Sequence, residues 1–261
     1  VGQNCAVNYF LEVSDMIYYE TYGNKFNPVI LFLHGESYVY SFAKQYELQK
    51  NYYLVVPHIP GFGKAAKEEY STDKAVEQIA ELAAFFGRQV TLVGFSLGAQ
   101  LCLPLMCKYP ELFNGCVMIS PWLLKTTEDI EKAIRQVDDI DKKLKSPITV
   151  NMSAVQLGLN AEQRRAHAEY CKDVRINTIV SAVDNGINLD DYPEYADIDK
   201  PMLALCGLKE QLEVRKTVRM LSQKNSHCTY DMWDGAVHNI PYKYPARLNK
   251  VLEEFVDKAN T

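Results

Sequence analysis

The chain has no long apolar segment and no strong excess of charge of either sign. No stretch approaches the roughly 18 to 20 uninterrupted apolar residues that a membrane-spanning helix needs, and the N-terminus lacks the basic start and apolar core of a secretion signal. The 28 Lys and Arg residues stand against 33 Asp and Glu residues, a formal net charge of −5. This balance disfavours a nucleic-acid or anionic-membrane surface. We therefore expect a cytoplasmic protein whose partner is a small-molecule substrate; the composition leaves its oligomeric state open.

The cysteines and histidines form no recognisable metal or redox motif. No two cysteines make a Cys-x-x-Cys pair, and the histidines show no ligand spacing. Several cysteines lie within apolar runs, where a thiol packs as a small core side chain. The seven are Cys5, Cys102, Cys107, Cys116, Cys171, Cys206 and Cys228. We therefore expect buried, reduced thiols, no metal site and no cofactor.

Short apolar runs alternate with helix-like segments along most of the chain. This alternation predicts an α/β fold with a mostly parallel, eight-stranded sheet flanked by helices. The first two strands are expected to form an antiparallel pair. The predicted strands are Tyr9–Val13, Met16–Thr21, Val29–Leu33, Tyr52–Val56, Gln89–Val93, Cys116–Ile119, Met202–Cys206 and Thr229–Trp233. The predicted helices are Ser41–Gln49, Thr72–Phe86, Leu97–Lys108, Val214–Gln223 and Pro241–Lys258.

The strand pattern stops between Leu123 and Asp199, where the sequence becomes charged and helix-like. This segment has too few apolar residues to build a core of its own. We therefore expect residues 1–124 and 196–261 to form the two parts of one α/β core, with residues 125–195 inserted between them as a small helical cap.

Residues 94 to 98 read Gly-Phe-Ser-Leu-Gly, between a predicted strand and a predicted helix. A serine flanked by glycines in such a turn exposes its hydroxyl, and the following helix directs its N-terminal amides at the reacting centre. The glycines are needed because the turn is too tight for side chains at those positions. The pattern predicts Ser96 as a nucleophile.

A nucleophilic serine needs a base and a carboxylate that orients the base. His238 lies between the last predicted strand and the last predicted helix, and is the best-placed histidine for the base. Glu210 follows the strand at 202–206, at the sheet edge where α/β proteins bind ligands, and is the candidate acid. Three other carboxylates remain candidates for the acid: Glu213, Glu128 and Asp129.

The chain resembles the α/β-hydrolase fold family, in particular its small capped, esterase-like branch. The resemblance covers nearly everything outside the cap and depends on several motifs in the family's order. These are Tyr18–Gly23, Leu33–Gly35, Pro60–Gly63, Gly94–Gly98, Tyr109–Pro110, and His238 ahead of Tyr244–Pro245. It implies a catalytic triad of Ser96, Glu210 and His238, and an oxyanion hole formed by the backbone N–H groups of Glu36 and Leu97. His34 would shape the oxyanion loop.

Three features depart from the family pattern. Glu210 stands where the acid is usually aspartate. Glu36 replaces an apolar residue, and its carboxylate would oppose the developing negative charge unless it turns away, is paired, or binds a cationic substrate group. His58 and Lys64 replace an aspartate and a serine at positions that are normally structural, so we assign them no role.

Aromatic residues fall at loop positions that converge on the mouth of such a site. They favour an apolar pocket, which Met152 and Leu157 of the cap would extend. The aromatic candidates are Tyr38, Tyr40, Phe62, Phe95 and Trp122, of which Tyr38, Phe95 and Trp122 are the predicted pocket residues.

These features predict a serine hydrolase that cleaves a small ester, thioester or related acyl substrate through an acyl-enzyme intermediate. Two alternatives remain. The same triad could serve carbon–carbon bond cleavage or acyl transfer, or the chain could be a ligand-binding protein on a hydrolase scaffold.

Overall fold

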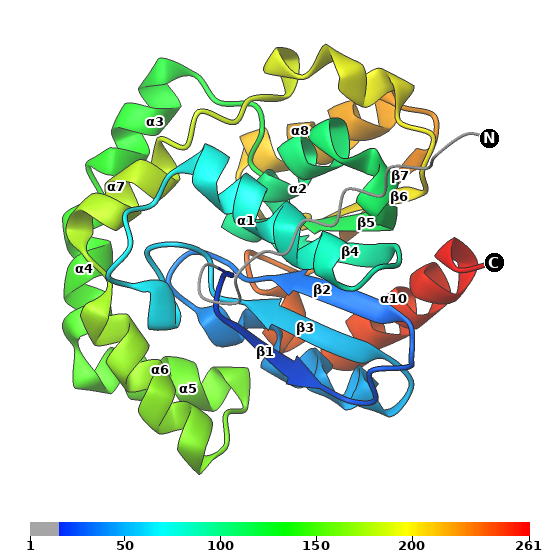
Figure 1. The fold of residues 1–261 in the computed structure, drawn as a ribbon. Coiled ribbons are helices and arrows are strands. Elements are labelled where there is room, and N and C mark those ends of the chain that lie inside the picture. The colour runs from blue at the N-terminus through cyan, green and yellow to red at the C-terminus, as the bar shows by residue number, and fades with distance from the viewer. Residues whose placement is uncertain (1–15) are drawn as a thin grey trace, which may run out of the picture.

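The computed structural model describes residues 16–261, which form a seven-stranded sheet with helices on both faces (Figure 1). The strand order is β1-β3-β2-β4-β5-β6-β7, with β1 antiparallel to β3 and the other pairs parallel. The strands are β1 Tyr19–Tyr22, β2 Val29–Leu33, β3 Tyr53–Pro57, β4 Val90–Phe95, β5 Phe113–Ile119, β6 Met202–Gly207 and β7 Cys228–Trp233. They confirm seven of the eight predicted strands; the eighth, at residues 9–13, lies outside the described residues.

The strands read as continuous apolar runs because both faces of the sheet are buried. Successive side chains of β2 point to opposite faces, as the pleat requires. Val29, Leu31 and Leu33 belong to the core on one face, while Ile30 and Phe32 belong to the core on the other.

Two groups of helices cover these two faces. On one face lie α1 Thr72–Phe85, α2 Leu97–Lys108 and α8 Leu212–Lys224; on the other lie the 3₁₀ segment η2 Val39–Lys50, α9 Ile240–Lys243 and α10 Pro245–Ala259. The five helices predicted for the core are all present, the first as a kinked 3₁₀ segment and the last divided at Tyr244 into α9 and α10. Shorter 3₁₀ turns are η3 Gly63–Ala65, η4 Pro110–Leu112, η5 Leu189–Asp191 and η6 Pro193–Asp197. Ser71 caps the start of α1 by accepting a hydrogen bond from the Lys74 N–H.

A run of helices separates β5 from β6 and lies along one side of the molecule (Figure 1). They are α3 Thr127–Ile134, α4 Val137–Lys145, α5 Pro147–Leu157, α6 Ala161–Asp173 and α7 Ile176–Val183. Val137, Leu144 and Val150 join the core on one face of the sheet, and Leu157 and Tyr170 join the core on the other. The helical segment therefore shares the cores of the sheet, in keeping with its few apolar residues.

Among residues 16–261 no helix combines the length and the hydropathy that a membrane crossing requires. These residues include six of the seven cysteines. All six are free thiols, and five of them are buried.

The start of α2 packs against the end of β2 at backbone contact distance. The Gly98 N–H donates a hydrogen bond to the His34 carbonyl oxygen at 3.1 Å. A Cβ atom at position 98 would lie 2.1 Å from the Leu33 carbonyl oxygen. Only glycine permits this approach, because the atom in the way belongs to the backbone and cannot rotate aside.

We expect Gly98→Ala to lower the free energy of unfolding by about 3 kcal/mol, because helix and strand must separate to admit the methyl group. Chemical denaturation measures the change. Gly87→Ala is the matched control: Gly87 has φ +62°, and a Cβ at this position would meet no atom within 4 Å, so only the left-handed backbone adds a cost of about 1 kcal/mol. Equal losses in the two variants would contradict the role of the close approach.

Candidate active site

The loops that follow four parallel strands meet at one point of the sheet edge. Glu36 follows β2, Ser96 follows β4, Glu210 follows β6 and His238 follows β7. β3 and β4 lie on opposite sides of β2, so the order of the strands reverses there. Open α/β sheets bind ligands at such a reversal, outside the carboxyl ends of the strands.

Ser96 lies in a sharp turn between β4 and α2. Its φ is +54° and its ψ is −114°, an unusual conformation for a residue with a side chain. Gly94 allows the turn, because a Cβ there would lie 2.3 Å from the Gly98 carbonyl oxygen. The Ser96 N–H donates to the Ile119 carbonyl oxygen at 2.9 Å, which fixes the turn to β5.

The structure brings the three predicted triad residues into one hydrogen-bonded line. Nε2 of His238 lies 2.9 Å from Oγ of Ser96, and Nδ1 of His238 lies 2.8 Å from Oε2 of Glu210. Because a carboxylate only accepts, Nδ1 carries the proton and Nε2 is free to accept the serine hydroxyl. The Glu210 side chain is 2% exposed, whereas that of His238 is 49% exposed. The His238 imidazole is therefore held by Glu210 on its buried side and is accessible on its other side.

Glu210 is anchored by two further donors. Its Oε1 accepts hydrogen bonds from the Ser120 hydroxyl at 2.7 Å and from the Gly207 N–H at 2.8 Å. Burial alone would raise the pKa of Glu210, but the hydrogen bond and charge of His238, with these two donors, outweigh it and lower the pKa. The longer side chain of glutamate thus reaches His238 by folding back towards the end of β6.

Ser120 did not emerge from the sequence as a site residue. It follows β5 directly and has φ +56°, which turns its hydroxyl towards Glu210. The only signal in the sequence was its place, a polar residue at the end of an apolar strand.

The other candidate carboxylates do not orient His238. Asp129 accepts hydrogen bonds from the N–H and the hydroxyl of Thr126, and so caps α3. Glu128 is exposed in the first turn of the same helix. Glu213 lies in the first turn of α8 and lines a cavity beside the site.

The backbone N–H groups of Glu36 and Leu97 donate a hydrogen bond to no residue within the range 16–261. Leu97 is the first residue of α2, where backbone donors have no partner within the helix. These are the two groups that the resemblance assigned to an oxyanion hole.

The oxyanion loop is held by His34. The buried imidazole donates from Nδ1 to the Gly35 carbonyl oxygen at 2.7 Å and accepts at Nε2 from the Ile59 N–H at 3.0 Å. Burial lowers the pKa of His34 to about 3, so the ring is neutral in this arrangement. The predicted structural role of His34 fits these contacts.

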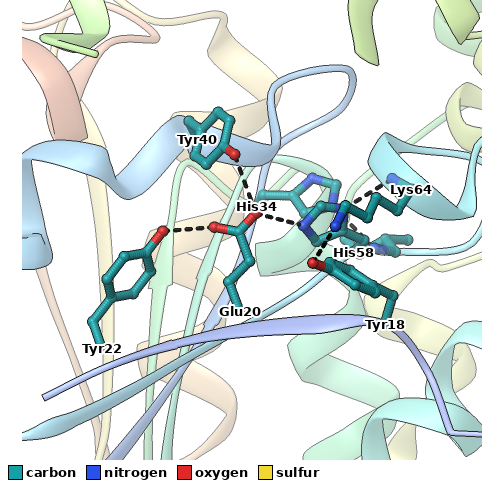
Figure 2. A network of polar contacts seen from close by, with 8 residues as sticks. Tyr18, Glu20, Tyr22, His34, Tyr40, His58 and Lys64 are labelled. Carbon is teal, nitrogen blue, oxygen red and sulfur yellow. Dashed lines mark hydrogen bonds and ion pairs between the residues drawn. The ribbon is translucent and has the colours of Figure 1, made fainter. Parts of the chain in front are cut away.

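A polar network at the sheet edge supports the neighbouring turn. Figure 2 shows Tyr22, Tyr40 and His58 converging on Glu20 of β1. The hydroxyl of Tyr22 lies 2.6 Å from Oε2, while the hydroxyl of Tyr40 and Nε2 of His58 lie 3.1 and 3.3 Å from Oε1. Nδ1 of His58 accepts the Lys64 N–H at 2.9 Å. His58 therefore connects β1 to the turn after β3. The residue after His58 is Ile59, whose N–H donates the hydrogen bond to Nε2 of His34.

Two cavities meet at Ser96. Glu36, Ser96, Ile140 and His238 line both. The smaller, about 300 Å³, is otherwise lined by Gly35, Ser37, Tyr38, Ser41, Phe95, Lys143, Leu144, Leu157 and Tyr242. The larger, about 660 Å³, adds Gln100, Ser120, Trp122, Asp129, Lys132, Ala133, Gln136, Ala182, Val183, Lys209, Glu210, Gln211, Leu212, Glu213, Val214 and Val237.

The predicted pocket residues Tyr38, Phe95 and Trp122 all line these cavities, and so does Leu157. The expectation for three others was wrong. Tyr40 turns to Glu20 on the other side of the loop, Phe62 is fully buried, and Met152 lies on the outer surface of α5, 61% exposed.

Comparison with known proteins places the chain among hydrolases. Residues 28–165, just over half of the chain, match the family described as the alpha/beta hydrolase fold. A 2-(acetamidomethylene)succinate hydrolase of Mesorhizobium japonicum is 22% identical over 249 residues, covering 88% of this chain and 88% of the relative.

Solved structures with the same fold include several esterases. A carboxylesterase of Nitrososphaera gargenis superposes with a TM-score of 0.73 at 13% identity, over 94% of this chain and 95% of that one. A thermophilic esterase of Thermogutta terrifontis gives 0.70 at 16% identity, over 94% of each chain. An enol-lactonase of Burkholderia xenovorans gives 0.74 at 16% identity, over 92% and 96%.

The Glu20 network predicts a pH-dependent contribution to stability. Burial alone would raise the pKa of Glu20, but the hydrogen bonds from His58 and Tyr22 outweigh it and lower the pKa. The ionised group therefore stabilises the fold above the unfolded pKa near 4.5, and this contribution is lost as the pH falls through the lower folded pKa.

We expect Glu20→Gln to cost about 1 to 3 kcal/mol near pH 7, because the amide nitrogen cannot accept the bonds that the carboxylate oxygen accepts. Denaturant unfolding should show this loss shrinking towards about pH 3. As a control, Glu68→Gln removes an exposed ion pair with Lys74 and should cost under about 1 kcal/mol. A loss for Glu20→Gln that stays constant across this pH range would disprove the ionised role of Glu20.

Proposed function

The chain belongs to the α/β-hydrolase fold family, and on that premise we propose that it is a serine hydrolase acting on a small ester, thioester or related acyl substrate through an acyl-enzyme intermediate. The observation that carries the proposal is the hydrogen-bonded line from Ser96 through His238 to the buried Glu210. This line ends where the strand order reverses and two cavities meet.

In the first half-reaction, Oγ of Ser96 attacks the carbonyl carbon while Nε2 of His238 takes the hydroxyl proton. Glu210 stabilises the imidazolium that forms. The N–H groups of Glu36 and Leu97 bind the oxyanion of the tetrahedral intermediate. When this intermediate collapses, His238 gives the proton to the leaving oxygen or sulfur, and the acyl group remains on Ser96.

Water completes the second half-reaction. His238 takes a proton from the water as its oxygen attacks the acyl carbon, and then returns the proton to Oγ of Ser96. The half-exposed imidazole suits this step, because its open side lies against the cavities while Glu210 holds the buried side.

The similar proteins support hydrolysis more than any one substrate. They include esterases, an enol-lactonase and the hydrolase of a substituted succinate. Succinate is a dicarboxylate, and the Glu36 carboxyl beside Ser96 would repel such an anion. A dicarboxylate substrate therefore does not suit this site.

We further propose that the helical segment at residues 125–195 acts as a cap. Leu144 and Leu157 line the smaller cavity from α4 and α5, and Ala182 lines the larger one from α7. The volumes of about 300 and 660 Å³ restrict the acyl and leaving groups to small molecules. The free, mostly buried thiols favour a reducing, cytoplasmic location.

A fluorophosphonate probe should label the wild-type protein at Ser96 and should fail to label Ser96→Ala. The same variant should lose about four orders of magnitude or more in ester hydrolysis, measured as release of the free acid. Ser153→Ala is a matched control, since Ser153 also lies 2.8 Å from a histidine, His167, but in the buried interior of the helical segment. Labelling that persists in Ser96→Ala, or unchanged recovery of every ester offered, would overturn the proposal.

Glu210→Ala should lower kcat by about a thousandfold, because His238 loses both its orientation and the charge that stabilises the imidazolium. Steady-state kinetics on an activated ester measure the loss. Glu213→Ala, three residues along the chain, should stay within about threefold of wild type, since Glu213 makes no contact with the imidazole. A larger effect at Glu213 than at Glu210 would reassign the acid.

A further inference from the structure

The hydrolytic mechanism uses the backbone of Glu36 but leaves its carboxyl group unused. Glu36 lines both cavities, together with Ser96 and His238. Glu36 therefore borders the space that substrate must enter, on the loop that would also bind the oxyanion.

Nothing among residues 16–261 neutralises this carboxyl. It has no hydrogen-bond donor or cation in contact, and burial, the one cause of its shift, raises the pKa of Glu36 to about 7. Its negative charge acts on Tyr70, where burial and the Glu36 charge outweigh a hydrogen bond to Thr72 and raise the pKa to about 12. Glu210 is buried as well, but three donors stabilise its charge. Glu36 is thus a desolvated acid that a bound cation would stabilise in its ionised form.

The larger cavity has the charge balance for such a cation. Its lining holds more carboxylates than amines. The carboxylates are Glu36, Asp129, Glu210 and Glu213, and the amines are those of Lys132 and Lys209. The indole ring of Trp122 also lines this cavity, and the face of an indole ring attracts a cation.

We propose that Glu36 is a substrate-recognition residue that selects substrates with a protonated amine or quaternary ammonium group. The proposal rests on the proposed function: the cation lies against the Glu36 carboxylate while the ester or thioester carbonyl lies at Ser96. With a neutral substrate, the carboxylate opposes the oxyanion that forms beside it. A substrate cation cancels that repulsion, so binding of the correct substrate also favours its transition state.

Two pairs of substrates separate charge from shape. Acetylthiocholine and its neutral carbon isostere place the cation on the leaving group, while methyl ε-aminocaproate and methyl heptanoate place it on the acyl group. Because Glu36 lines both cavities, both pairs are needed. In Glu36→Gln, we expect kcat/KM to fall by about 10- to 100-fold for the cationic member of at least one pair. This is the effect expected from losing one charge-assisted contact between the carboxylate and the substrate cation. For the neutral members it should stay within about threefold or rise, since the carboxylate no longer opposes the oxyanion.

Two variants serve as controls. Glu36→Asp keeps the charge and should retain a preference for the cation, which a purely structural role of Glu36 would not produce. Glu81→Gln removes an exposed carboxylate of α1 that lines neither cavity, and should leave the preference within about threefold. Equal losses for cationic and neutral members in Glu36→Gln would overturn the proposal.

A binding measurement on Ser96→Ala keeps this proposal separate from the hydrolase proposal, because it needs no turnover. Phenylbutylammonium should bind more tightly than phenylbutanol by calorimetry or ligand-observed NMR, and Glu36→Gln in the same background should abolish the difference. Absence of probe labelling and of all turnover would refute the hydrolase while leaving this readout intact. Equal binding of the two ligands would refute cation recognition, whatever the catalytic result.

Discussion

The backbone contact between the start of α2 and the end of β2 determines the geometry of the site. Gly98 brings the helix within 3.1 Å of the His34 carbonyl oxygen. Leu97 begins that helix and Glu36 follows that strand, so the same contact sets the distance between their N–H groups. Ser96 immediately precedes the helix and moves with it. A shift of α2 would therefore move Ser96 and the Leu97 N–H together, away from the Glu36 N–H, which explains why the chain has glycine at this position.

The carboxylates of Glu20, Glu210 and Glu36 show how partners decide the role of a buried charge. Burial opposes ionisation at each. Glu20 and Glu210 each accept three hydrogen bonds, which lower their pKa values and make them fixed anchors of a loop and of an imidazole. Glu36 accepts none from residues 16–261, and its pKa rises to about 7. This contrast between two satisfied carboxylates and a third without a partner, at a cavity junction, supports the proposal that Glu36 meets a substrate cation.

The sequence predicted the elements well because both faces of the sheet are covered. Strands buried on both sides read as unbroken apolar runs, and the Gly-x-Ser-x-Gly turn marks the start of α2 to the residue. Glu210 and His238 were also predictable from the sequence. Each follows a strand whose carboxyl end lies at the same edge of the sheet as Ser96. The direction in which an individual side chain points could not be predicted from these patterns. The Ser120 hydroxyl meets a carboxylate 90 residues away, and Tyr40 leaves the site mouth for Glu20, contacts that depend on packing between distant segments.

The placement of Glu36 gives one residue two roles that differ in their electrostatic demands. Its N–H group would stabilise negative charge at the substrate oxygen, while its carboxylate would oppose that charge from the same loop. An apolar side chain would keep the first effect without the second, so the carboxylate would lower the rate for any neutral substrate. Discrimination between substrates is a difference of free energies, and a residue that penalises neutral molecules contributes to it as fully as one that attracts cations. Under the proposed cation recognition, the repulsion at Glu36 would thus select against neutral substrates.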